Sequence, residues 1–222
     1  DVSIRDPSGR APVAIDGVDG RRHQIHITDI DSSGDLAAGA IVRIEPLKQP
    51  NGRYGLTTIS ALTLEQQITS CGPTWLDQQL VASMPEALGE GFGQEVRQAL
   101  TDRTHYLVAQ GLGHRENGKL VLIGGLLDEL KQRELAEAIQ SISRSTGLAA
   151  LPSGIGEHVA GTCRQEIRLN SGRFAMIDNG MGFQLVPWEP ALGRRLGHEV
   201  AGIVNEHGGI DWSFDRSRSI GL

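Results

Sequence analysis

The chain has 222 residues, 39% of them hydrophobic and 22% charged, and its formal net charge is −6. This composition is typical of soluble globular proteins, and the sequence lacks the run of about eighteen apolar residues that a membrane-spanning helix needs. The acidic balance argues against a dedicated non-specific DNA-binding protein, because phosphate neutralisation by Lys and Arg supplies most of that affinity.

The charge is spread evenly over the length of the chain. Residues 1–60 hold seven Lys/Arg against eight Asp/Glu, residues 61–150 seven against eleven, and residues 151–222 seven against eight. Any contact with nucleic acid is therefore expected to be a local patch. The polar start without Met predicts a fragment of a longer protein with no signal peptide. The two distant cysteines, Cys71 and Cys163, favour a reducing cytoplasm.

Residues 1–60 are predicted to form a small β-barrel of the OB or SH3 type. Asp19-Gly20 and Asn51-Gly52 are turn dipeptides between apolar runs, as in tight hairpins. Three or four short strands of this kind need closure to hide their edges.

Residues 61–150 are predicted to be helical, with the outline of a winged helix. Thr63 and Thr74 are candidate N-caps of two short helices, and a longer helix follows over about residues 92–110. Asn117-Gly118 then predicts a hairpin. A last amphipathic helix is expected over about residues 125–145, with Gly147 as its C-terminal cap.

Residues 151–222 are predicted to form a second small antiparallel β unit, so that the fold class is α+β. Turn dipeptides separate its apolar runs at Ser171-Gly172, Asn179-Gly180 and Gly208-Gly209. The stretch 151–157 is the expected linker before this unit.

The histidines, cysteines and tyrosines of the sequence do not have the spacings typical of metal sites or nucleophiles. We therefore expect no catalytic residue, no metal site and no cofactor. The seven histidines lack the HxH and HExxH spacings, and the cysteines lack CxxC. Tyr54 and Tyr106 are better explained as packing residues than as nucleophiles. The GEGFG run at 89–93 precedes a helix, where backbone amides can bind phosphate, but its spacing favours helix entry and tight packing.

Two groups of basic residues are candidate nucleic-acid contacts. In the helical middle a winged helix would use its long helix and hairpin, and the residues concerned are Arg97, Arg103, His105, His114, Arg115 and Lys119. In the last unit the candidates are Arg164 and Arg168, which share a parity along one strand, and Arg173 across the turn. A winged helix used only for packing or protein contact is the alternative, and it is favoured.

A partner-binding surface is predicted in the last unit. Phe174, Phe183, Trp188, Trp212 and Phe214 lie within about sixty-five residues of a chain that is 4% aromatic. An exposed Trp188 bordered by Arg194 and Arg195 would suit an interface. The alternative is that all five aromatic residues belong to the core.

The order of several sequence stretches resembles one known family. These stretches are AIDGVDGRRH, GAIVRI, LEQQITSCGPTWLDQQLV, GFGQEVRQAL, LLDELKQRELAEA, SGRFAMI and FQLVPW. Together they resemble the C-terminal region of bacterial conjugative relaxases, the mobilization nucleases of the Vir-type, MOBP class. The resemblance covers nearly the whole chain and departs at Cys163, where the family pattern has an aromatic residue, usually Tyr.

The resemblance implies a non-catalytic region of a longer enzyme that nicks one DNA strand at a transfer origin. Its task would be to position DNA, or to recruit the coupling protein that feeds the type IV secretion channel. The implied location is the cytoplasm of the bacterial donor, and transfer to the recipient with the DNA stays open. A stand-alone regulatory DNA-binding protein of winged-helix type is the alternative.

Overall fold

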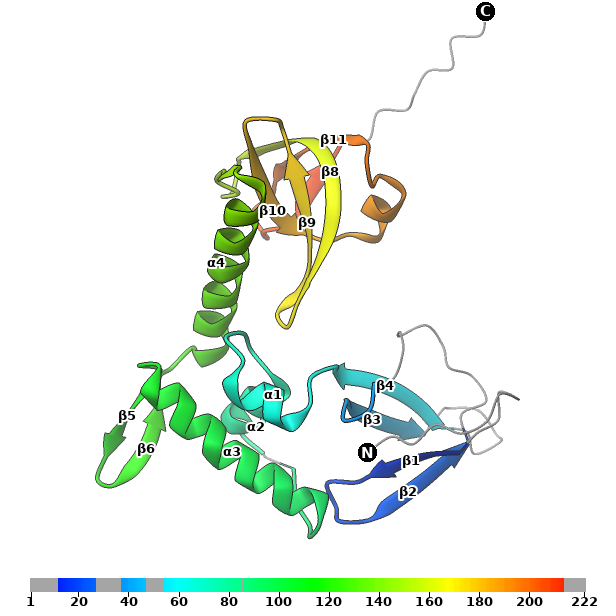
Figure 1. Cartoon of the computed structure of the whole chain (residues 1–222), viewed down its shortest axis with the longest axis vertical. Helices are drawn as coiled ribbons and strands as arrows, with labels where there is room; N and C mark the ends of the chain where they lie inside the picture. Colours follow the sequence, from blue (N-terminus) through cyan, green and yellow to red (C-terminus); the bar gives the residue numbers. More distant parts are fainter. Residues whose placement is uncertain (1–11, 27–36, 47–53, 85, 214–222) are drawn as a thin grey trace, which may run out of the picture. The chain divides into compact units, whose positions relative to one another are not determined.

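The computed structural model describes residues 12–26, 37–46, 54–84 and 86–213 and has a mixed α+β fold (Figure 1). The chain divides into two compact units, Asp1–Leu130 and Lys131–Leu222. No helix in the described ranges is long and apolar enough to cross a membrane.

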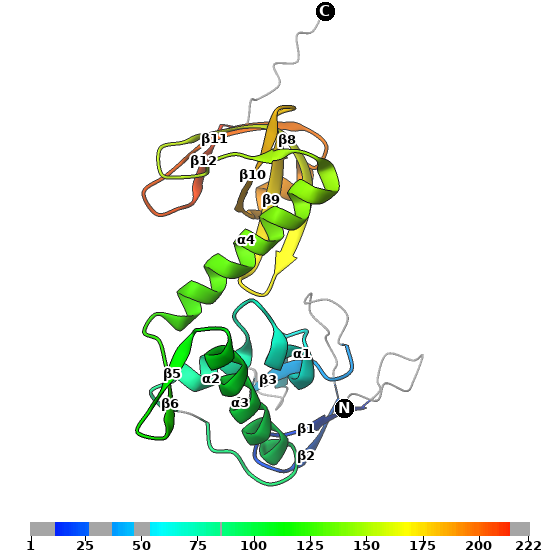
Figure 2. The ribbon, with the colours of Figure 1, turned by 60° about the vertical axis from the view of Figure 1, so that its left-hand side comes forward.

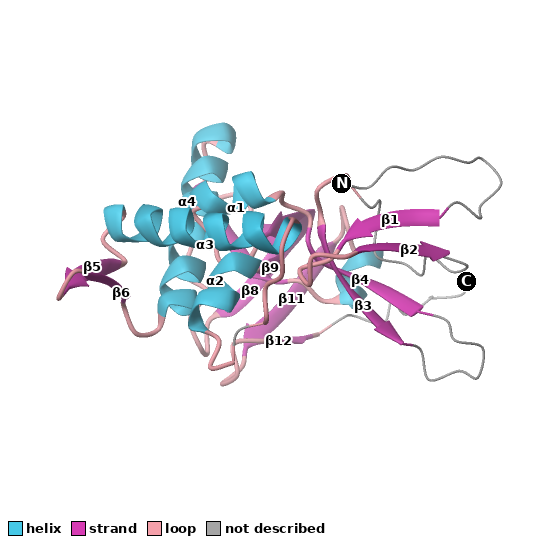
Figure 3. Ribbon diagram, turned by 90° about the horizontal axis from the view of Figure 1, so that it is seen from below, coloured by secondary structure: helices cyan, strands magenta, loops and turns pink. Residues whose placement is uncertain are grey.

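The first unit begins with two separate β-hairpins. Strands β1 (Pro12–Asp16) and β2 (Arg22–His26) pair antiparallel, and so do β3 (Ile41–Pro46) and β4 (Tyr54–Ser60). Over the described residues no ladder joins the two hairpins, so the closed barrel predicted for residues 1–60 is not formed (Figure 3). The predicted turn Asn51-Gly52 lies outside the described residues.

The hairpins contact the helices instead of closing on each other. The Gly89 N–H donates to the Val18 carbonyl in the β1–β2 turn at 2.7 Å. Ile41 of β3 is buried with Trp75, and Ile59 of β4 packs against the same cluster. Each hairpin therefore buries apolar surface against the helical part, which removes the need for barrel closure within the described residues.

Three helices follow, and their starts agree with the sequence signals. Helix α1 (Leu64–Thr69) begins at Thr63 and α2 (Trp75–Val81) at Thr74, each with a complete capping box. The longer α3 (Phe92–Ala109) begins after Gly91, which has φ +58°.

A short hairpin follows α3, also as predicted. Strands β5 (Gly113–Glu116) and β6 (Lys119–Leu122) pair antiparallel. Asn117 and Gly118 both have positive φ, 48° and 80°, as a two-residue type I′ turn requires. The order of three helices and a hairpin is thus the predicted one.

Helix α4 (Leu126–Thr146) supplies apolar side chains to both units. Leu126 and Leu130 are buried with Leu107 and Leu112 in the first unit. Further along the helix, Ile142 is buried in the second unit.

The second unit is built on one six-stranded sheet with the order β12-β11-β8-β9-β10-β7. Its strands are β7 (Ala149–Ala150), β8 (His158–Leu169), β9 (Gly172–Asp178), β10 (Gly182–Pro187), β11 (Glu199–Val204) and β12 (Ile210–Trp212), with the 3-10 helix η1 (Pro190–Arg194) after β10. All neighbours are antiparallel except β7, which runs parallel to β10. The sheet of the second unit is therefore antiparallel, as predicted, except at the edge formed by β7.

Apolar clusters lie on both faces of this sheet. One face buries Cys163, Ala175 and Ile177 together with Leu192 of η1. The other face buries Met176 and Phe183 against α4, which crosses it in Figure 2. The buried Glu134 carboxylate of α4 accepts the backbone N–H groups of Asn170 and Ser171, both at 2.8 Å, and so holds the β8–β9 turn.

The stretch 151–157, the expected linker, is hydrogen-bonded into the sheet. The Leu151 N–H donates to the Phe183 carbonyl at 2.8 Å and the Gly156 N–H to the Val204 carbonyl at 2.9 Å. The Gln184 side chain donates to the Pro152 carbonyl at 2.5 Å. These bonds fix the stretch to the second unit.

Candidate functional site

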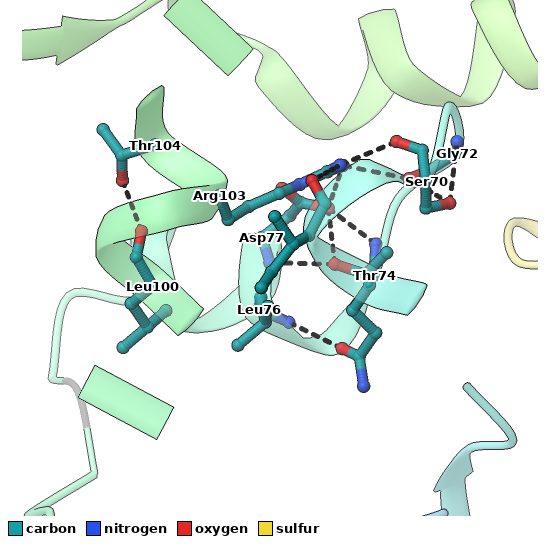
Figure 4. Close-up of polar contacts among 10 residues, drawn as sticks. Ser70, Gly72, Thr74, Leu76, Asp77, Leu100, Arg103 and Thr104 are labelled. Atoms are coloured by element: carbon teal, nitrogen blue, oxygen red, sulfur yellow. Dashed lines mark hydrogen bonds and ion pairs between the residues drawn. The ribbon is translucent and has the colours of Figure 1, made fainter. Parts of the chain in front are cut away.

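Arg103, a predicted nucleic-acid contact, lies in the core of the first unit (Figure 4). Its Nε and Nη2 atoms donate to the two carboxylate oxygens of Asp77 at 2.8 and 2.9 Å. Its remaining hydrogen bonds go to three backbone carbonyls, those of Ile68 at 3.0 Å, Ser70 at 2.6 Å and Gly72 at 3.2 Å. A guanidinium has five N–H donors, so every donor is used inside the protein.

Both partners of this ion pair are fully buried. Asp77 also accepts the Thr74 backbone N–H at 2.7 Å and the Thr74 hydroxyl at 2.8 Å, which caps α2. The guanidinium carbon lies 5.5 Å from the centre of the Tyr106 ring. This arrangement ties α3 to the loop between α1 and α2, and it removes Arg103 from the residues that can contact DNA.

The other candidates of the helical middle do not form one basic face. Arg97 is exposed, but its Nη1 donates to the Leu88 carbonyl at 2.7 Å. On the hairpin, Glu116 lies directly opposite Lys119, and the His114 Nε2 is 4.0 Å from the Glu116 carboxylate. Arg115 falls between His114 and Glu116 on β5, so its side chain points to the opposite face of the hairpin.

The GEGFG glycines pack against the β1–β2 turn. A Cβ at Gly89 would overlap the Asp19 carbonyl oxygen, and one at Gly93 would lie 2.5 Å from the Val18 carbonyl oxygen. Close approach of two backbones explains these glycines, as the sequence predicted. The exposed His105 lies on α3 away from this contact.

One of the two arginines of β8, Arg164, lies in a β-bulge. Cys163 pairs with Ile177, but Gln165 pairs with Met176, so Arg164 is the extra residue. Its Nε donates to the Asp178 carboxylate at 2.9 Å. The bulge interrupts the alternation at Arg164, whereas residues 165–168 pair regularly with β9, so the shared face of Arg164 and Arg168 stays a prediction.

Three predicted site residues do come together at the other end of the sheet. Arg168 of β8 lies directly opposite Arg173 of β9. The Trp188 N–H, just beyond β10, donates to the Arg173 carbonyl at 2.9 Å and so continues the row. Trp188 is half-buried and packs against the cluster that includes Ala175. We call Arg168, Arg173 and Trp188 the arginine–tryptophan row.

A single carboxylate serves both arginines of the row. The Glu166 oxygen accepts from the Arg168 Nε at 3.0 Å and lies 3.6 Å from the Arg173 Nη1. The side chains of Arg168 and Arg173 are 77% and 54% exposed, whereas that of Glu166 is 20% exposed. The cluster therefore carries a net positive charge that faces solvent. Sequence reasoning missed Glu166, although its spacing of two from Arg168 on a strand places both on one face.

The predicted partner-binding residues border this row. Helix η1 packs on the Trp188 ring, since a Cβ at Gly193 would lie 3.8 Å from its Cζ2. Arg194 follows and is exposed, whereas Arg195 is half-buried. Among the aromatic residues Phe183 is fully buried, and Phe174, Trp188 and Trp212 are half-buried; Phe214 lies outside the described residues.

Two titratable groups of the second unit have shifted pKa values. The pKa of Asp178 lies below its ordinary value, chiefly because its carboxylate accepts the Gly180 N–H at 2.7 Å and also because of Arg164. Burial raises the pKa of the Cys163 thiol, which is a core residue. Among the described residues, no group of three or more His, Cys, Asp or Glu could hold a metal ion.

Comparison with protein families gives one match, over residues 48–221, to the family described as "Protein of unknown function (DUF3363)". The chain belongs to this DUF3363 family. The matched range contains all four helices and the whole arginine–tryptophan row, and the β1–β2 hairpin precedes it. Neither the curated proteins nor the solved structures gave a match.

Proposed function

We propose that this DUF3363 chain is a non-catalytic region of a conjugative relaxase, and that its second unit holds the phosphate backbone of the transferred DNA. The arginine–tryptophan row is the observation that carries this proposal. The resemblance to relaxase C-terminal regions supplies the biological setting.

The row has the chemistry of a phosphate contact. Two like charges directly opposite each other destabilise a sheet, and Glu166 neutralises only one of them. A phosphate placed at the exposed ends of both guanidinium groups would relieve this repulsion. Arginine forms paired hydrogen bonds with phosphate oxygens, which makes it the preferred residue for this task.

Trp188 gives the row an aromatic neighbour. Proteins that bind single strands combine cationic side chains with aromatic rings on which bases stack. The half-buried ring of Trp188 lies beside the phosphate-binding arginines. We propose that the exposed edge of this surface, with Arg194 and Arg195, also borders the contact with the coupling protein of the secretion channel.

The helical middle serves packing in this proposal. Three helices and a hairpin in this order fit a winged-helix-like module. One of its candidates for a nucleic-acid contact, Arg103, is buried, and another, Lys119, faces Glu116. We propose that the module contacts protein rather than reading DNA.

A binding experiment with a fluorescent 20-nucleotide single strand tests the proposal. The variant Arg168→Gln/Arg173→Gln should bind about tenfold or more weakly at low salt. Each phosphate contact contributes a slope of about −0.7 to the dependence of log K on log salt. The variant should therefore have a slope shallower by about 1.4.

The matched control is Arg115→Gln/Lys119→Gln, which removes the same charge from the exposed β5–β6 hairpin. It should retain the parental affinity. Equal losses in both variants would mean that only net charge matters, and would refute the assignment of the row. Tight, sequence-selective binding that depends on the hairpin would favour the winged-helix reader instead.

A further inference from the structure

A cavity of about 310 Å³ opens between the two hairpins of the first unit. Its walls come from residues 15–19, at the end of β1 and in its turn, and from residues 39–44, which include most of β3. The lining is completed by His23, Ile59, Trp75, Glu86 and Phe92. This volume lies at the lower end of the range for ligand pockets.

The strand β3 borders the cavity with its edge. Val42, Arg43 and Ile44 all line the cavity although they are consecutive. Side chains alternate between the faces of a strand, so consecutive lining residues mean that the backbone between them also faces the space. Within the described ranges β3 pairs only with β4 and β1 only with β2, which leaves one edge of each strand outside any ladder.

The lining combines an apolar floor with an acidic mouth. Ile41 and Trp75 are buried at the floor, and Val42, Ile44 and Phe92 are half-buried. The mouth holds three carboxylates, those of Asp16, Asp19 and Glu86. The guanidinium of Arg43 and the ring of His23 also lie there, and the His23 Nε2 is 3.3 Å from the Asp19 carboxylate.

Two of these carboxylates are ionised at neutral pH. The pKa of Asp16 lies below its ordinary value because Arg22 donates to it at 2.8 Å. The pKa of Asp19 is lowered chiefly by the Arg21 backbone N–H, at 3.1 Å. Arg22 and Arg43 offset two of the three carboxylates, so the mouth keeps one excess negative charge, which favours a cationic group.

We propose that this cavity receives an extended segment of a partner polypeptide, which adds a strand at the β3 edge. Backbone groups of the β3 edge would give the affinity, and the apolar floor would select apolar side chains at alternate positions. The carboxylates at the mouth would select Lys or Arg at one end of the segment. This inference does not depend on the proposed DNA contact, which lies in the other unit.

A random octapeptide library displayed on phage, selected on the 222-residue chain, is the probe. Enriched peptides should have apolar residues at alternate positions and a terminal Lys or Arg. The enriched sequence, made as a free peptide, should lose at least tenfold in affinity when alternate backbone nitrogens are methylated. Methylation removes the N–H groups that strand addition needs and leaves the side chains in place.

The variant Val42→Lys should abolish this binding, because it puts a cation into the apolar lining. The matched control Ile203→Lys makes the same change at an exposed position of β11 and should bind as the parent does. Circular dichroism of both variants checks that they are folded.

Three results would overturn the proposal. These are a selection without enrichment, enriched peptides that bind Val42→Lys as well as the parent, and binding that survives methylation. Binding that appears only after removal of residues 1–11 would identify that segment of the chain as the occupant in place of a partner.

Discussion

Arg103 illustrates how a single residue can look functional in sequence and be structural in the fold. An arginine on the long helix of a predicted winged helix is a reasonable DNA contact, and nothing local distinguishes it from Arg97. Its partner Asp77 lies 26 residues earlier. An ion pair between residues this far apart in the chain cannot be recognised from the sequence, because it depends on how α2 and α3 pack.

Replacing Arg103 with Met should destabilise the first unit by about 3–5 kcal/mol, because the substitution leaves the buried Asp77 carboxylate without its cation. Urea unfolding followed by fluorescence measures the loss. Arg97→Met, an exposed arginine of the same helix, should cost less than about 1 kcal/mol. Similar small losses for both variants would show that the Arg103 site is hydrated or rearranges.

Asp178 should make a measurable contribution to the pH dependence of stability. Its folded-state pKa is lowered from 3.8, so its stabilisation is present above pH 3.8 and is lost as the pH falls through the folded-state value. In Asp178→Asn the free energy of unfolding should therefore fall less between pH 6 and pH 3 than in the parent. An equal fall in both proteins, measured by urea unfolding at each pH, would contradict this assignment.

At the scale of elements, local signals predicted the helices and turns well. Thr63 and Thr74 begin α1 and α2, Asn117-Gly118 turns the β5–β6 hairpin, and Gly147, with φ +74°, follows the end of α4. These features depend on neighbouring residues alone. The bulge at Arg164 does not depend on neighbouring residues alone, because it is defined by a mismatch with β9.

Barrel closure and the linker were the other features that local patterns could not predict. The turn dipeptide Asp19-Gly20 indicates a hairpin but not what covers it, and here Gly89 contacts the turn. Likewise the Gly/Pro content of residues 151–157 suggests a free linker, whereas its backbone is bonded to β10 and β11. Long-range backbone contacts decided both cases.

The contact between the β1–β2 turn and the start of α3 depends on glycine at position 89. Gly89→Ala should destabilise the first unit by about 1–3 kcal/mol, because the added methyl group overlaps the backbone of Asp19. Gly124→Ala is the control, since a Cβ there meets nothing within 4 Å. Thermal unfolding compares the two. Equal unfolding temperatures for the two variants would mean that the contact between the turn and the helix contributes little to stability.

At the scale of the whole molecule, the net charge of −6 and the spacing of the histidines in the sequence both motivate a prediction about catalysis. We predict that the chain alone does not cleave single-stranded origin DNA in Mg²⁺ or Mn²⁺. Metal-dependent phosphoryl transfer needs a metal site, and the histidines of the sequence lack the HxH and HExxH spacings typical of one. Cleavage on a denaturing gel that disappears in Tyr54→Phe or Tyr106→Phe would refute this prediction.

The bulge in β8 has a consequence for how the length of this strand can vary. On one side of Arg164 the strand sends Cys163 to the cluster of η1, and on the other side it sends Ile167 to the cluster of α4. Deleting Arg164 would remove the extra residue of the bulge and leave Cys163 and Gln165 paired with Ile177 and Met176 in a regular ladder. Deleting another residue of β8 would instead move part of the strand's side chains to the opposite face. Length changes in β8 of related chains should therefore occur at position 164 or in the turns at the ends of the strand.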